Sequence, residues 1–169
     1  MIKTFSSKIA YLDKLKMHYI TVHDDVLEAF IEDGEFRYNQ RFYITLNDVI
    51  TWQAGTVSLG NNAAYITLSK ARMKALDVHF GDEVEVRLKK DSSEFGFDVP
   101  EEFTEVLRQD PEGNERFRAM PKGKQRGIIY LVSQVKSSDK RIEKSLFFIE
   151  NLKRAPKGKE TMRHLLGKE

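Results

Sequence analysis

The sequence contains one short pattern twice. Tyr19-Ile20-Thr21-Val22 and Tyr65-Ile66-Thr67-Leu68 each end an apolar run, and their shared Tyr-Ile-Thr triplets lie 46 positions apart. A short amphipathic helix can begin after each of them, at Asp24-Asp25 in the first copy and after the N-cap residue Ser69 in the second. A strand-helix unit present in two copies predicts a domain built from two similar halves.

His23, Asp24 and Asp25 also allow a catalytic interpretation, as paired carboxylates beside a histidine base. The start of a helix explains the two carboxylates more simply, because there they meet unpaired N–H groups and the positive end of the helix dipole. In the second copy Lys70 and Ala71 occupy the positions of Asp24 and Asp25, and they cannot perform the same chemistry. With no other catalytic motif in the chain, we expect no catalytic residues and a protein that is not an enzyme.

The chain around the two copies has the character of β-strands as far as residue 90. The clearest case is Glu83 to Lys90, where Val84, Val86 and Leu88 alternate with charged residues. Asp33-Gly34 is expected to end the first short helix, and the second is expected over residues 70–76. The expected strands cover residues 8–20, 36–46, 51–59, 63–68 and 83–90.

The periodicity becomes helical after Phe95-Gly96-Phe97. Expected helices cover 101–109, 114–120 and 125–136, and a last helix follows the capping residues Ser137-Ser138-Asp139 with its apolar side at Ile142, Leu146, Ile149 and Leu152. The expected domains are therefore a small β-barrel over residues 1–98, a helical segment over residues 99–154 and a basic flexible tail over residues 155–169.

The second copy and the strand after it resemble a known small fold. The stretch from Ile66 to Leu76, followed by Phe80-Gly81-Asp82-Glu83-Val84-Glu85-Val86, is similar to the repeating unit of the split β-barrels typified by AbrB and MazE regulators. Barrels of that type are assembled from two chains, each supplying one half. Because this chain carries two copies, the resemblance implies an α+β fold in which the half-repeats are fused in one small split β-barrel, and it implies a monomer.

The wider context resembles a two-part bacterial family. With Trp52 and Gly55 before the second copy and Val99-Pro100-Glu101-Glu102-Phe103 after it, the barrel part is similar to a bacterial domain of unknown function. That domain is commonly followed by a helical segment of the YdeI/OmpD-associated, bacteriocin-protection type, which Phe117-Arg118-Ala119-Met120-Pro121 and residues 126–142 resemble. The resemblance covers residues 8–153 and implies a binding or interaction role in stress or bacteriocin protection. Residues 136–142 lack the Glu-Thr-Arg tripeptide of the helical segment, which puts any role of that tripeptide in doubt.

Charge is distributed unevenly along the chain. Residues 116–169 hold 15 basic and 5 acidic side chains, whereas residues 1–98 hold 12 basic and 15 acidic ones. An excess of this kind suggests an anionic partner such as DNA or RNA, although a solvated basic surface is the simpler interpretation. The candidate anion-binding residues are Lys122, Lys124, Arg126, Lys140, Arg141 and Lys144.

Other classes of site have little support. The chain has no cysteine, and its four histidines share no metal-ligand spacing, so we expect neither a metal nor another cofactor. Trp52, with Gln53 and Gly55 nearby, could line a barrel mouth that binds a small ligand, but a single tryptophan is more often part of a core. No apolar run is long enough to span a membrane and the N-terminus carries no apolar signal region, so we expect a cytoplasmic protein without membrane insertion.

Overall fold

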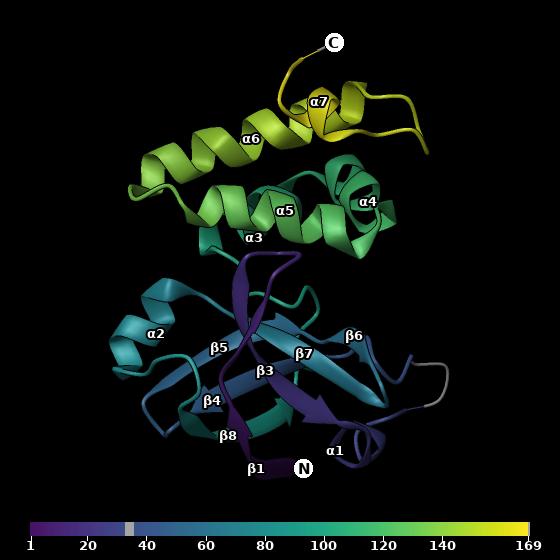
Figure 1. Ribbon diagram of the computed structural model, residues 1–169. Helices are drawn as coiled ribbons and strands as arrows, with labels where there is room; N and C mark the ends of the chain where they lie inside the picture. The colour runs from purple at the N-terminus through teal and green to yellow at the C-terminus, as the bar shows by residue number, and fades with distance from the viewer. Residues whose placement is uncertain (33–35, 169) are drawn as a thin grey trace. The chain divides into compact units, whose positions relative to one another are not determined.

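The chain divides into two compact units, residues 1–92 and residues 93–169, each with a hydrophobic core of its own. We call them the sheet unit and the helical unit. The computed structural model describes residues 1–32 and 36–168 (Figure 1). Within these residues the fold is mixed α and β, with eight strands in two antiparallel sheets and seven helices. No helix in the described ranges has the length and apolar character that crossing a bilayer requires.

The sheet unit contains all eight strands and two short helices. Its elements are β1 (Ile2–Lys8), β2 (Ala10–Leu12), β3 (Met17–His23), α1 (Asp24–Glu28), β4 (Arg41–Leu46), β5 (Ile50–Gly55), β6 (Val57–Gly60), β7 (Ala63–Leu68), α2 (Lys70–Leu76) and β8 (Glu83–Lys90). One sheet has the strand order β1-β8-β4-β5 and the other β2-β3-β7-β6. Every strand pair in both sheets is antiparallel.

The strand orders follow the internal repeat. Exchanging β1 with β5, β2 with β6, β3 with β7 and β4 with β8 reproduces both sheets. The two copies of the Tyr-Ile-Thr triplet are paired with each other across the β3/β7 ladder, where Ile20 lies opposite Ile66 and Tyr19 opposite Thr67. The repeated stretch therefore marks the centre of an internal two-fold arrangement, which confirms that the domain has two similar halves.

Alternation along the strands supplies the core of this unit. Val84, Val86 and Leu88 are buried on one side of β8, as their period-two pattern predicts, and Ile20 and Ile66 are buried together at the centre of the repeat. Trp52 is half-buried against this core, and the Arg72 guanidinium lies 4.6 Å from the centre of its ring. Trp52 thus has the core role that its solitary occurrence predicts.

Several predicted boundaries in the sheet unit are wrong. The expected strand over residues 8–20 is interrupted by a turn at Lys16, whose φ of 50° an extended strand cannot contain, and the separate strand β1 was not predicted. The strand expected from residue 36 begins at Arg41. Helix α1 ends at Glu28; the predicted terminator Asp33-Gly34 lies outside the described residues.

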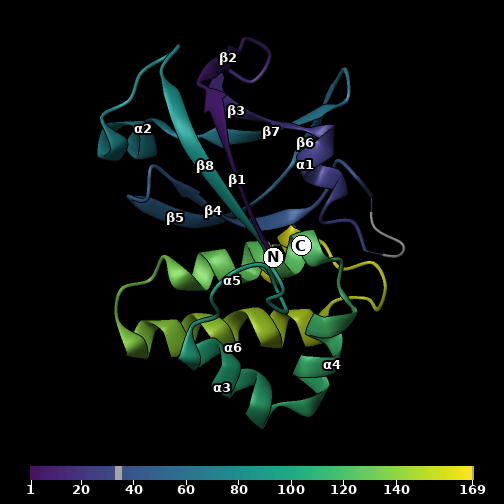
Figure 2. The same cartoon turned by 90° about the horizontal axis from the view of Figure 1, so that it is seen from below.

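The helical unit consists of five helices. They are α3 (Glu101–Gln109), α4 (Pro111–Ala119), α5 (Lys122–Ser133), α6 (Ser138–Arg154) and α7 (Met162–Leu165). The long helix α6 contacts each of the other four (Figure 2). Phe103, Phe117 and Phe148 are fully buried where α3, α4 and α6 meet, and the rings of Phe103 and Phe117 are in edge-to-face contact.

Two predictions at helix ends need correction. The helix expected over 114–120 begins earlier, at Pro111, because Asp110 ends α3 and also caps α4 by accepting a hydrogen bond from the Gly113 N–H at 2.9 Å. Pro111 fits there because the first turn of a helix needs no N–H donor from it. Helix α5 begins at Lys122, with Pro121 as its N-cap residue, and not at Gln125.

The last predicted helix buries only part of its expected apolar side. Ile149 and Leu152 are buried together with Phe148, whereas Ile142 and Leu146 are 39% and 48% exposed. The segment predicted as a basic flexible tail, residues 155–169, includes α7, and Leu165 is fully buried in the core of the helical unit.

Candidate functional site

The helical unit has a groove of about 860 Å³ between α3 and α6. We call it the α3/α6 groove. Helix α3 and the flanking residues Val99 and Asp110 supply most of the lining, and the first turns of α6 supply the rest. None of the described residues that line it is basic. The lining carboxylates are Glu101, Glu102, Glu105 and Asp110.

Three of these carboxylates have lowered pKa values, because neighbouring groups donate hydrogen bonds to them. Hydrogen bonds from Arg108, and then from Gln109, lower the pKa of Glu105 to about 2. The Lys153 ammonium lies 2.7 Å from Asp110 and, with the Gly113 N–H, lowers the pKa of Asp110 below its usual value. Glu105 and Asp110 therefore stay ionised at a lower pH than ordinary carboxyl groups do.

Glu102 and Glu101 complete the acidic lining. The backbone N–H of Glu102 itself is the main cause of its lowered pKa, followed by the Ser138 hydroxyl and then Arg141, whose guanidinium lies 3.7 Å away. The Glu101 side chain forms no hydrogen bond or ion pair with any other described residue. Its charge is therefore available to a ligand.

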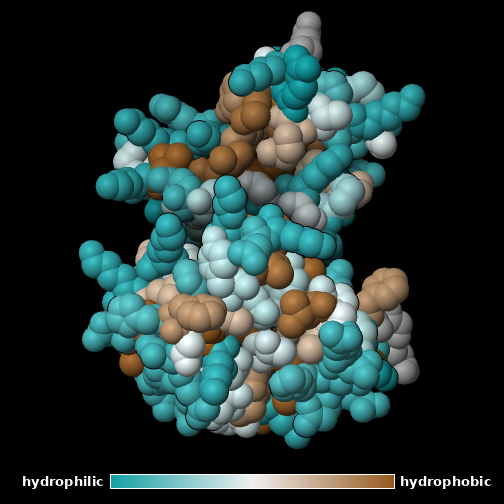
Figure 3. All heavy atoms as spheres, viewed as in Figure 1, coloured by the Kyte–Doolittle hydropathy of each residue, from teal (hydrophilic) through white to brown (hydrophobic). Residues whose placement is uncertain are grey.

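The groove also has an apolar part. Val99, Val106, Ile142 and Leu146 line it, and Ile142 and Leu146 lie one turn apart on α6. Hydrophobic atoms are visible among hydrophilic ones on the part of the helical unit that carries α6 (Figure 3). Apolar side chains beside fixed carboxylates can bind a ligand that is itself apolar on one side and cationic on the other.

The six predicted anion-binding residues lie on α5 and α6, and some are engaged within the unit. The Lys124 ammonium donates a hydrogen bond to the Glu160 carbonyl at 2.6 Å, and Arg141 Nε donates to the Val135 carbonyl at 2.6 Å. The Lys122 ammonium lies 3.4 Å from the Glu94 carbonyl. The side chains of Arg126, Lys140 and Lys144 make no hydrogen bond or ion pair with a described residue. Anion binding by the six stays a prediction.

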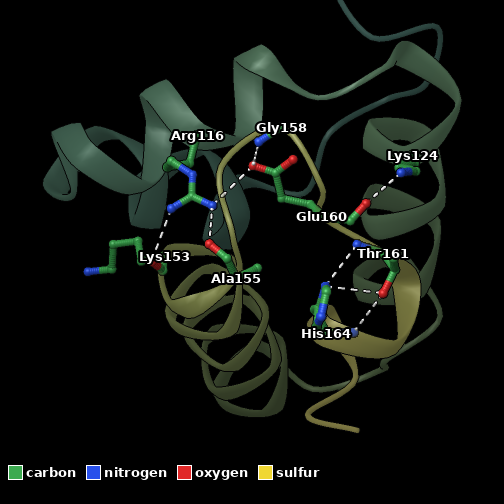
Figure 4. Close-up of polar contacts among 8 residues, drawn as sticks. All are labelled: Arg116, Lys124, Lys153, Ala155, Gly158, Glu160, Thr161 and His164. Atoms are coloured by element: carbon green, nitrogen blue, oxygen red, sulfur yellow. Dashed lines mark hydrogen bonds and ion pairs between the residues drawn. The ribbon is translucent and has the colours of Figure 1, made fainter. Parts of the chain in front are cut away.

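Figure 4 shows how the segment after α6 is attached. The buried guanidinium of Arg116 donates hydrogen bonds to the carbonyls of Lys153 and Ala155, at 3.0 and 2.7 Å, and to the Glu160 carboxylate at 3.0 Å. Arg116 thus ties α4 to the C-terminal end of α6 and to the segment that leads into α7. This contact explains why the predicted tail follows a defined path along the unit.

The alternative site at the first copy of the repeat has structural contacts. Asp24 and Asp25 lie in the first turn of α1, where the helix dipole favours carboxylates, and Arg37 is 3.1 Å from Asp24. Among the described residues, no group of three or more His, Asp or Glu side chains is placed to hold a metal ion.

Comparison with known families follows the same division of the chain. Residues 5–88 match the family model of a domain of unknown function, DUF1905, and residues 96–155 match OmdA, described as bacteriocin-protection, YdeI or OmpD-associated. The chain therefore joins a DUF1905 domain to an OmdA domain. Their order confirms the two-part resemblance, and every residue that lines the α3/α6 groove lies in the OmdA match. No curated protein matches the chain.

The groove was not predicted from the sequence. Its signal is weak but present: Glu101, Glu102 and Glu105 lie close together on α3, and Glu105 directly precedes the apolar Val106. The spacing of Ile142 and Leu146 predicts an apolar helix side, but only the packing shows that no other helix of the unit covers it.

Proposed function

We propose that the protein is a non-catalytic interaction module of bacterial stress or bacteriocin protection. Its contact surface would be the α3/α6 groove, and its ligand a basic amphipathic helix of a partner protein. The observation that carries the proposal is the composition of the groove, four carboxylates and four apolar side chains with no cation in the lining. The setting is supported by the OmdA description, which refers to bacteriocin protection.

An α-helix is a suitable ligand because the groove lies between two α-helices. An amphipathic helix presents apolar residues at positions i, i+3, i+4 and i+7, and it can bury them in a hydrophobic groove between two helices. Its Leu or Ile residues would contact Ile142 and Leu146, and flanking Lys or Arg residues would face Glu101 and Glu105. Charge complementarity of this kind favours a basic ligand over DNA or RNA, because phosphates would be repelled by the lining carboxylates.

The proposal is tested with a synthetic peptide that forms a Leu- and Lys-rich amphipathic helix. We expect it to bind the full chain, and we expect Leu146→Ser to weaken binding by about tenfold, because one well-buried Leu contributes about 1.5 kcal/mol or more. Fluorescence anisotropy with a labelled peptide measures the affinity. Glu101→Gln should weaken binding less, and mainly at low salt.

Matched controls make the result specific. Phe147→Ser removes an apolar side chain that is 49% exposed, next to Leu146 but outside the groove, and it should leave the affinity unchanged. A peptide with Glu in place of each Lys should not bind. Equal loss of affinity for Leu146→Ser and Phe147→Ser would refute the groove as the contact surface. Salt-sensitive binding of RNA, weakened by Lys140→Glu and Lys144→Glu, would favour the nucleic-acid alternative instead.

For the sheet unit, the proposed architecture is a small split β-barrel fused from two halves. The exchange of the halves that reproduces both sheets, and the burial of residues from both sheets in one core, support it. Each half finds its partner within the chain at the β3/β7 ladder, so a second chain is not needed. We therefore expect light scattering coupled to size exclusion to give a monomer mass; a stable dimer at micromolar concentration would contradict this proposal.

A further inference from the structure

A second hollow of the helical unit lies at the C-terminal end of α6, beside α7. It has a volume of about 420 Å³. Three basic residues from separate positions in the chain line it, Arg154 at the end of α6, His164 in α7 and Lys168 after it. None of the described lining residues is acidic. We call this hollow the basic pocket.

Each of the three basic side chains has N–H donors that a ligand can accept. The side chains of Arg154 and Lys168 form no hydrogen bond or ion pair with another described residue. The Thr161 backbone N–H donates to Nδ1 of His164 at 3.1 Å, which requires that Nδ1 carry no proton (Figure 4). The ring proton is therefore on Nε2, and this N–H is the donor that the imidazole can present to a ligand.

Local contacts hold the segment that carries two of these groups. Asn151 on α6 donates to the Leu165 carbonyl at 3.0 Å, and the Leu165 side chain is buried. The N–H groups of Gly167 and Lys168 donate to carbonyls of α7 at 3.0 and 2.8 Å. Gly167 has a φ of 69°, and a Cβ built there would lie 3.2 Å from Cζ of Phe147, so glycine allows this close turn against α6. The chain around His164 and Lys168 is thus anchored.

We propose that the basic pocket binds the phosphate group of a small phosphorylated molecule. A guanidinium can form two parallel hydrogen bonds to a phosphate, and an ammonium and an imidazole N–H can satisfy its remaining oxygens. The volume falls in the range of roughly 300 to 1,000 Å³ that is typical of small-molecule sites. His164 and Lys168 lie outside the matched OmdA segment, and none of the three belongs to the α3/α6 groove. The inference is therefore independent of the proposed function.

The test is a titration of the full chain with inorganic phosphate and with glycerol 3-phosphate, at constant ionic strength set with chloride. Calorimetry should show saturable binding of both probes at one site. Arg154→Gln and Lys168→Gln should each weaken the affinity about tenfold, as expected for the loss of a hydrogen bond from a charged group. Lys157→Gln, which removes a basic residue of the same segment that does not line the pocket, should leave the affinity unchanged.

Two results would overturn the inference. The first is that neither probe binds saturably. The second is that Lys157→Gln and Arg154→Gln lower the affinity equally, which would show a nonspecific electrostatic attraction of phosphate to the basic segment. Sedimentation with phosphatidylcholine vesicles, with and without phosphatidic acid, distinguishes a site for a free phosphate monoester from a site for a lipid headgroup. We expect no sedimentation of the protein with either vesicle; sedimentation with phosphatidic acid and no binding of glycerol 3-phosphate would contradict a small-molecule site.

Discussion

Replacing Arg116 with alanine is expected to destabilise the helical unit by about 3 to 5 kcal/mol, the usual effect of removing one partner from a buried ion pair. The side chains of Arg116 and Glu160 are only 8% and 12% exposed. The change would leave Glu160 without its cation, and it would remove the donors to the carbonyls of Lys153, in the last turn of α6, and of Ala155, its C-cap residue. Urea unfolding of the full chain, followed by circular dichroism, measures the change.

A neighbouring arginine provides the control. Arg118 lies on the same helix but is exposed, and it pairs with the exposed Glu94, so Arg118→Ala should cost no more than about 1 kcal/mol. Hydrogen exchange should show that Arg116→Ala increases the amide exchange rates of residues 155–165 more than those of the rest of the helical unit. If Arg116→Ala and Arg118→Ala had equal effects, Arg116 would not be what holds this segment in place.

The Arg116 contact also predicts a pH dependence. Burial alone would raise the pKa of Glu160, but hydrogen bonds from its own N–H and that of Gly158, with Arg116, lower it below the ordinary value. A carboxyl whose pKa is lower in the folded state stabilises the fold above its unfolded pKa, about 4.3, and this contribution is lost as the pH falls toward the folded pKa. The stability difference between wild type and Glu160→Gln should therefore be full at pH 6 and shrink below about pH 4.

Gly113→Ala is expected to destabilise the protein by about 1 to 3 kcal/mol, although alanine ordinarily favours a helix over glycine. Gly113 is buried in α4, and a Cβ built there would lie 2.3 Å from Cγ2 of Ile149 on α6 and 2.9 Å from the Asp110 carboxylate. The helices must move apart to accommodate the methyl group. Thermal or urea unfolding measures the loss.

Two companion variants test the cause. Gly127→Ala in α5 meets no atom within 4 Å and should stabilise the protein, by up to about 1 kcal/mol. Ile149→Ala removes the methyl group that a Cβ at position 113 would meet, so the double variant should lose less stability than the sum of the two single variants. Strict additivity would show that the α4/α6 contact does not determine the need for glycine.

Local sequence patterns correctly predicted the elements that are specified by the periodicity and capping residues of their own segments. The strict alternation from Glu83 to Lys90 and the helix over 101–109 were predicted with the correct ends, and so was α2 with its N-cap Ser69, which accepts a hydrogen bond from Arg72. The repeat predicted two similar halves. In each case the relevant interactions lie within a few residues, or the same pattern occurs twice.

What escaped prediction depends on long-range contacts. Strand β1 exists because it pairs with β8, more than 70 residues later, and its own sequence lacks a clear alternation. The path of residues 155–168 depends on Arg116, whose partner Glu160 is 44 positions away. Ile142 and Leu146 have the same helical spacing as buried residues, so only the helix packing separates a groove from a core.

The central claim is that the α3/α6 groove binds a basic amphipathic helix, and amide chemical shifts test it most directly. The ¹⁵N-labelled full chain would be titrated with the Leu- and Lys-rich peptide. We predict that the largest shifts occur in α3, at residues 101–109, and in the first turns of α6, with α5 little affected. Shifts concentrated in α5, or no shifts at a saturating peptide concentration, would contradict the account.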